Sequence, residues 1–114
     1  MVSYRHSNKQ HHLRKRERVM TREMKMVTRL HQYTTEFVAM ETEKETYYRK
    51  NIRNINRTTI NTLHLMQCHV DTLIKQICML VRRLNREGID FDNEVATYVF
   101  NTYESTIRRG FFDI

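Results

Sequence analysis

The clearest pattern in the chain is a stripe of apolar residues that recurs at alternating spacings of three and four between Leu63 and Leu84. These spacings correspond to the a and d positions of a heptad repeat, and further apolar residues lie beside them at e. The face is wider than the seam of a two-stranded coiled coil, so it predicts packing against more than one helix, within the chain, in a partner protein or in a second copy. This predicted helix-packing face consists of Leu63, Met66, Val70, Leu73, Ile74, Ile77, Leu80, Val81 and Leu84.

A thinner helical stripe precedes this face. Its apolar residues are Leu13, Met20, Val27 and Leu30, with Met24 and Phe37 close by. The stripe disappears between Glu41 and Thr46, which makes this polar stretch a candidate hinge. The following segment, Asn51–Thr62, is rich in Asn and Thr, which are poor helix formers, and the apolar pattern shifts phase there. Helix stability is therefore expected to dip in this segment.

Residues that end helices or form turns are scarce, because the chain contains no proline and only two glycines, Gly88 and Gly110. We therefore predict an all-α fold with one long central helix at about 13–87, interrupted at most near 41–46. Gly88 is placed as a left-handed C-cap, and Asp90 or Asp92 as the N-cap of a second, short helix at about 92–109.

The apolar residues expected on this short helix are Val95, Tyr98, Val99, Tyr103 and Ile107. It is expected to fold back over part of the 63–84 face, leaving the rest of that face for a partner. Residues 1–12 are polar and aperiodic and predict a disordered basic tail, so 13–114 form a single helical domain or rod.

Charge is concentrated at the N-terminal end. The chain carries a formal net charge of +7, and residues 1–31, with nine Lys/Arg and two acids, account for all of it. This basic arm predicts binding to an anionic partner: nucleic acid, an anionic membrane, or an acidic protein polymer such as a microtubule. A merely solubilising charged end is the simpler alternative. The candidate binding residues are Arg14, Lys15, Arg16, Arg18, Arg22, Lys25 and Arg29.

Motifs for catalysis are lacking. The two glycines form no phosphate-binding loop, and the carboxylates cluster in a thin, exposed helical stretch that would not tune their pKa values for acid–base work. His64 and Cys68 have the i, i+4 spacing of metal ligands, but a structural zinc site needs about four ligands and the sequence supplies no others in pattern. We therefore expect no enzyme activity, no cofactor, no small-molecule substrate and no metal site.

The two cysteines, Cys68 and Cys78, lie ten residues apart in one predicted helix. At 1.5 Å per residue they would be roughly 15 Å apart, too far to form a disulfide, and two buried, reduced thiols are expected. No segment is apolar enough to span a membrane or to act as a signal peptide. An intracellular protein is therefore expected, in the cytoplasm or on the cytoskeleton, with the nucleus as an alternative.

The size of the chain, its long central helix with looser ends, its basic character and its lack of catalytic motifs together resemble the Goddard family of small Drosophila male-germline proteins, thought to have arisen as young genes. This resemblance implies a role in spermatogenesis at the axoneme of the sperm cilium, without a fold inherited from an older family. The expected function is thus that of a non-enzymatic structural or protein-binding helical protein. The alternative is a module that binds nucleic acid or an anionic membrane through the basic arm.

Overall fold

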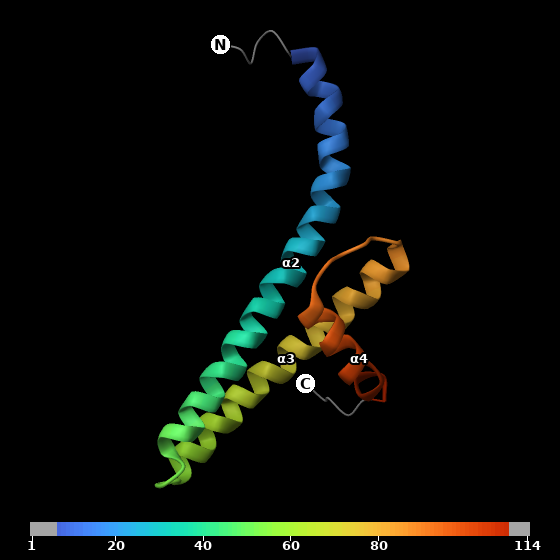
Figure 1. Cartoon of the computed structure of the whole chain (residues 1–114). Coiled ribbons are helices and arrows are strands. Elements are labelled where there is room, and N and C mark those ends of the chain that lie inside the picture. Colours follow the sequence, from blue (N-terminus) through green and yellow to red (C-terminus); the bar gives the residue numbers. More distant parts are fainter. Residues whose placement is uncertain (1–6, 110–114) are drawn as a thin grey trace.

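The computed structural model describes the backbone of residues 7–109 and the side chains of residues 22–109. Within residues 7–109 the chain forms three helices: α2 (Ser7–Asn51), α3 (Arg57–Glu87) and α4 (Glu94–Arg108). α2 and α3 form an antiparallel hairpin, and α4 packs across the part of α3 that is remote from the hairpin turn (Figure 1). The expected all-helical class is confirmed, since residues 7–109 include no strand. The molecule is elongated, with extents of 68 × 37 × 22 Å.

The helix break lies at residues 52–56, where the chain turns back on itself. The expectation of one central helix over 13–87 is therefore wrong, and two long helices lie side by side. Asparagine side chains compete with helical backbone hydrogen bonds at this turn. Asn51 Nδ2 donates to the carbonyl oxygen of Tyr47 at 2.8 Å, and Asn56 Oδ1 accepts from the N–H of Thr59 at 2.9 Å as the N-cap of α3. The break thus falls where helix stability was expected to dip.

The stretch from Glu41 to Thr46, a candidate hinge in the sequence, is continuous α-helix. Glu and Lys are good helix formers, and ion pairs at helical spacing add to the stability of this stretch. Lys44 Nζ lies 2.9 Å from Glu41 Oε1, and it also donates to Gln67 Oε1 of α3 at 2.7 Å. The loss of the apolar stripe here is therefore not a break in the helix, and these residues lie outside the shared core. At its other end α2 begins at Ser7, within the segment 1–12 expected to be a tail.

The end of α3 follows the expected glycine cap. Gly88 has φ +69°, the left-handed conformation that suits glycine. Its N–H donates to the carbonyl of Asn85 at 3.2 Å, and the N–H of Ile89 donates to the carbonyl of Leu84 at 2.9 Å. This pair of bonds is the Schellman motif, and Ile89 packs on the core as the motif favours.

α4 lies within the short helix expected at 92–109, but its N-cap is Asn93 rather than Asp90 or Asp92. Asn93 Oδ1 accepts from the N–H of Ala96 at 3.0 Å, and its Nδ2 donates to Thr34 Oγ1 of α2 at 2.9 Å. Asparagine can make both contacts because its side chain carries an acceptor and a donor, whereas an ionised aspartate only accepts. Gly110, the second glycine of the chain, lies outside the described residues.

The core lies where the three helices meet. α3 contributes most of the buried residues, α2 contributes Met26, Leu30 and Phe37, and α4 contributes Ala96 and Val99. α4 does fold back on α3: the thiol of Cys78 lies 3.8 Å from the carbonyl oxygen of Val99. The wide face of α3 is thus covered from two sides within the chain. The side chains of Leu13 and Met20, expected on the packing stripe of α2, lie outside the described ones.

Two details of the expected apolar faces differ. Met24 and Tyr98 are each 61% exposed, while the buried positions beside them are Met26 and Ala96. The small side chain of Ala96 lets α4 approach α3 closely. The contact of α4 is therefore centred on Ala96 rather than on the larger side chain of Tyr98. Among the described residues no helix combines the length and hydrophobicity needed to cross a bilayer.

Replacing a core residue of α3 tests whether the chain folds on its own core. Ile77 is fully buried, so Ile77→Ala should lower the free energy of unfolding by about 2–4 kcal/mol through lost burial and a cavity. Leu65→Ala on the same helix, at a position 68% exposed, should change it by less than about 0.5 kcal/mol. Chemical denaturation followed by circular dichroism measures both. Equal effects, or a dependence on protein concentration, would contradict this packing.

A second substitution tests the link from α4 to α2. Asn93→Ala removes the N-cap of α4 and the bond to Thr34, and should lower the free energy of unfolding by about 1–3 kcal/mol. Asn101→Ala, at an exposed position of α4, is the matched control and should have little effect. Thermal unfolding of both variants measures the two effects on stability. An unchanged midpoint of unfolding for Asn93→Ala would rule out this capping role.

Candidate functional site

The residues of the predicted helix-packing face are mostly used inside the chain. Six of the nine are buried: Val70, Leu73, Ile74, Ile77, Val81 and Leu84. Leu80 is partly buried against the same core, whereas Leu63 and Met66, nearer the hairpin turn, are half-buried outside it. A binding partner would therefore meet residues beside this face rather than its centre.

The basic arm runs along α2 beyond the end of the hairpin. Arg22 Nη2 lies 3.2 Å from Oε1 of Glu87, the last residue of α3, so the part of α2 before Arg22 extends past α3 (Figure 1). Arg22, Lys25 and Arg29 follow helical spacings of three and four and are all exposed on one side of α2. The side chains of Arg14, Lys15, Arg16 and Arg18 lie outside the described residues.

The hairpin adds a fourth cation to this side, because α3 brings Arg83 next to the α2 residues. Arg29 and Arg83 both line a shallow groove of about 210 Å³ between the two helices, with an apolar floor that includes Tyr33, Met79 and Leu80. We call Arg22, Lys25, Arg29 and Arg83 the basic face. The sequence indicates only that Arg83 is a cation near the end of a predicted helix. Its position beside α2 depends on the turn at 52–56, which the apolar pattern does not predict.

Glu87 partly neutralises this face. Its Oε2 accepts from Arg83 Nε at 2.9 Å, while its Oε1 contacts Arg22. The hydrogen bond from Arg83, aided by the charges of Arg22 and Arg86, holds the pKa of Glu87 below its usual range. Because this pKa is lower in the folded chain, the contribution of Glu87 to stability is present above the ordinary glutamate pKa. It is lost as the pH falls through the depressed value.

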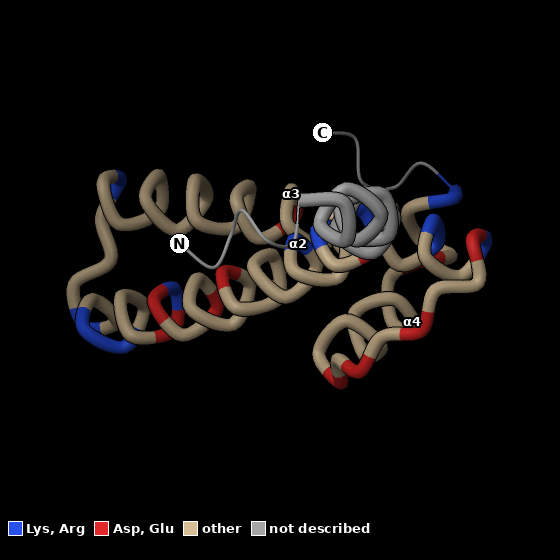
Figure 2. The backbone as a smooth tube through the Cα atoms, turned by 90° about the horizontal axis from the view of Figure 1, so that it is seen from above, with Lys and Arg blue, Asp and Glu red and all other residues tan. Residues whose placement is uncertain are grey.

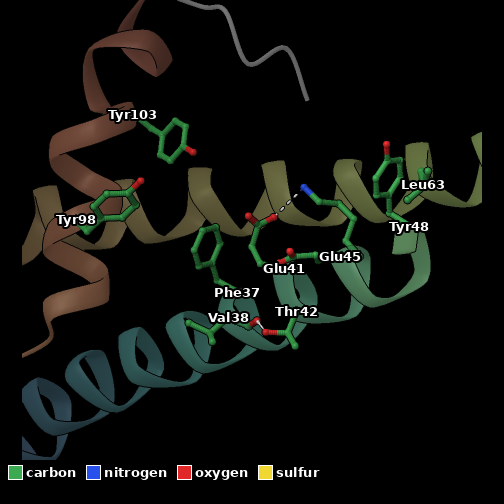
Figure 3. A pocket seen from close by; sticks show the side chains of 10 residues that line it. Phe37, Val38, Glu41, Thr42, Glu45, Tyr48, Leu63, Tyr98 and Tyr103 are labelled. Carbon is green, nitrogen blue, oxygen red and sulfur yellow. Dashed lines mark hydrogen bonds and ion pairs between the residues drawn. The ribbon is translucent and has the colours of Figure 1, made fainter. Parts of the chain in front are cut away.

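A larger groove, of about 560 Å³, lies between α2 and α4 on the other side of the hairpin (Figure 3). Phe37 and Glu41 of α2 face Tyr98 and Tyr103 of α4 across it, and Leu63 of α3 lies toward the hairpin turn. Oε1 of Glu41 is buried and lies 2.9 Å from Nζ of Lys44, which balances its charge.

The ionisable groups of this groove are held in place by ion pairs and burial. Glu41 is paired with Lys44, and Glu45 with Arg49 at 2.6 Å. Burial raises the pKa of Tyr103, and the nearby phenol of Tyr98 and the carboxylate of Glu41 raise it further. A protonated phenol beside carboxylates that are paired with cations can orient a bound group. The groove is thus lined by apolar and aromatic side chains such as Phe37 and Leu63 together with the paired carboxylates Glu41 and Glu45.

The histidines and cysteines of α3 do not converge. His64 Nε2 lies 3.7 Å from Cys68 Sγ, whereas His69 Nε2 instead contacts Glu36 Oε1 of α2 at 2.9 Å. Within residues 22–109 no three His, Cys, Asp or Glu side chains come together in a way that could hold a metal ion. The expectation that both thiols are buried is wrong for Cys68, which is exposed, and holds for Cys78.

The two thiols should differ in reactivity. Burial, with the nearby charge of Glu104, raises the pKa of Cys78 to about 11, so its reactive thiolate is scarce at mildly alkaline pH. We expect iodoacetamide to label Cys68 rapidly in the folded protein and Cys78 only after unfolding, as peptide mass spectrometry would show. In the control variant Cys68→Ser no rapid labelling should remain. Comparable labelling of both cysteines in the native chain would contradict the burial of Cys78.

Comparisons with known proteins identify no relative: no family model, no curated protein and no solved structure matches this chain.

Proposed function

We propose that this chain is a non-enzymatic helical interaction protein that binds an acidic protein polymer along its basic face and the N-terminal part of α2. The observation that carries this proposal is the convergence of Arg22, Lys25, Arg29 and Arg83 from two helices onto one side of the molecule. Cations held at fixed spacing on rigid helices meet an extended anionic surface without ordering a flexible segment first.

The distribution of charge supports a one-sided contact. The acidic residues lie mainly on the middle of α2 and around α4, away from the part of α2 that bears the basic face (Figure 2). The α2 helix continues the line of this face beyond α3 for residues 7–21, which is about 22 Å at 1.5 Å per residue. The proposed binding surface therefore runs along the N-terminal half of α2, a linear shape that suits contact with a filament.

The preferred setting is the cytoskeleton of a cilium or sperm axoneme, with the acidic surface of a microtubule as the polymer. The chain's resemblance in size, helical content and basic character to small male-germline proteins supports this setting. Nucleic acid or an anionic membrane at the same basic arm is the alternative partner. The structure bears on this choice through the groove between Arg29 and Arg83, whose apolar floor suits a protein segment with both acidic and apolar side chains.

The test neutralises the two arginines that flank the groove. Arg29→Gln with Arg83→Gln should weaken cosedimentation with polymerised tubulin on the order of fivefold to tenfold at low salt, and less at high salt, because both charges are exposed. The matched control is Arg108→Gln with Arg109→Gln at the end of α4, which removes the same charge elsewhere. Equal losses in the two double variants would show that only net charge matters and would reject the basic face.

A variant that is expected to strengthen binding completes the test. Glu87→Gln frees Arg22 and Arg83 from their shared carboxylate, so it should strengthen polymer binding severalfold. Removal of residues 1–21 retains Met26 and Leu30 of the core. It isolates the contribution of the part of the basic arm that precedes Arg22. The nucleic-acid alternative would be favoured if the chain bound duplex DNA more tightly than tubulin and if this affinity fell steeply with salt concentration. Under that alternative, removal of residues 1–21 should abolish the salt dependence.

A further inference from the structure

The end of the hairpin combines positive charge with exposed apolar side chains. From Thr46 to Val70 the chain contains four Lys/Arg and no Asp/Glu. These cations gather where α2 turns into α3, as the blue segments at that end of the hairpin show (Figure 2). We call this end the hairpin tip, and it comprises Tyr48, Arg49, Lys50, Ile52, Arg53, Ile55, Arg57 and Ile60.

The apolar side chains of the tip lie far outside the core. Ile52 is 49% exposed, Ile55 48% and Ile60 58%, and Tyr48 beside them is 42% exposed. The core is confined to the other half of the hairpin, where α4 packs. Single exposed apolar residues are common on protein surfaces, but here Ile52 and Ile55 of the turn and Ile60 in the first turn of α3 are exposed within nine residues of chain, which makes this end a candidate interaction site.

The cations of the tip are largely unneutralised. Arg49 pairs with Glu45, and both side chains are well exposed, so this contact screens little. Lys50, Arg53 and Arg57 have no acidic partner within residues 22–109. The first turn of α3 contains no acid and instead begins with Arg57, a cation at the positive end of the helix dipole. An anion outside the chain would stabilise this arrangement.

We propose that the hairpin tip docks on an anionic lipid bilayer. The isoleucines would enter the boundary between headgroups and acyl chains, while Lys50, Arg53 and Arg57 meet lipid phosphates and carboxylates. Basic residues around a small apolar patch are the pattern by which segments bind such an interface. The apolar side chains exposed at the tip are mainly isoleucines, and Tyr48 is its one aromatic ring, so the tip suits acyl chains better than it suits stacking on bases.

The geometry allows this docking without any change in fold. The tip forms one extreme of the elongated molecule, whereas α4 and the basic face lie toward the other (Figure 1). Ile52 and Ile55 belong to the turn, so their side chains can enter a membrane while every helix stays paired. This surface is separate from the basic face, so a failure at one leaves the other untouched.

The chain has no tryptophan, which permits a single fluorescent reporter. In Ile52→Trp, vesicles of phosphatidylcholine with about one third phosphatidylserine should shift the emission to the blue, and brominated acyl chains should quench it. Pure phosphatidylcholine vesicles should do neither at the same lipid concentration. The control is Tyr98→Trp, an exposed position on α4, whose emission should not respond to either vesicle.

Two matched variants separate the apolar and the charged contributions. Ile52→Ser with Ile55→Ser should lower vesicle cosedimentation by roughly tenfold with net charge unchanged. Arg53→Gln with Arg57→Gln should lower it by roughly tenfold or more, since each basic residue near an anionic surface contributes about fivefold. Arg29→Gln with Arg83→Gln removes equal charge at the basic face and should leave the emission shift of the Ile52→Trp reporter intact. Circular dichroism checks that each variant remains folded.

The outcomes decide the proposal. No emission shift at position 52, an equal shift at position 98, or equal cosedimentation of the isoleucine double variant and the parent chain would overturn it. Quenching of the Ile52→Trp reporter by single-stranded DNA, without a response to vesicles, would overturn it in favour of nucleic acid. Insertion at position 52 that persists in the Arg29→Gln, Arg83→Gln variant would support it, whatever the result with tubulin.

Discussion

Burial of the wide apolar face of α3 is the interaction on which the rest of the structure depends. Ile77 and Leu84 are fully buried, and no single helix could cover both the a/d row and the neighbouring e row that includes Ile74 and Val81. α2 covers one side and α4 the other, which fixes the turn at 52–56 and the loop after Gly88. The positions of both interaction surfaces follow from this arrangement, since α3 carries Arg83 to the basic face and presents Ile60 at the tip.

The sequence predicted the elements whose signals are local. The heptad spacing from Leu63 to Leu84, the glycine cap at Gly88 and the short helix after it could each be recognised from residues close together in the chain. The turn between α2 and α3 could not be, because three asparagines without glycine or proline give a weaker signal than the gap in the apolar pattern at 41–46. In the folded chain residues 41–46 lie outside the core that the three helices share, so this stretch of helix needs few apolar residues.

The candidate surfaces likewise divide into residues that the sequence could group and residues that only the fold brings together. The exposed cations Arg22, Lys25 and Arg29 lie on one helix and could be grouped from their spacing. Arg83 and Glu87 join them only because the hairpin closes, and so the sequence could not place them. At the tip, Ile52 and Ile55 follow Tyr48 at helical spacings of four and three in the sequence. The turn places them in solvent, so their exposure depends on knowing where the helix ends.

The uneven placement of the core has a consequence for local stability. From Val38 to His69 the only buried residue is Thr59, whereas all other buried side chains among the described residues lie in the half of the hairpin that α4 covers. Opening the tip half would expose little apolar area, so its backbone amides are expected to exchange with solvent by partial unfolding while the three-helix half stays closed. The chain then behaves as two cooperative units of different stability. A surface bound at the tip would protect the weaker unit and leave the stronger one unchanged.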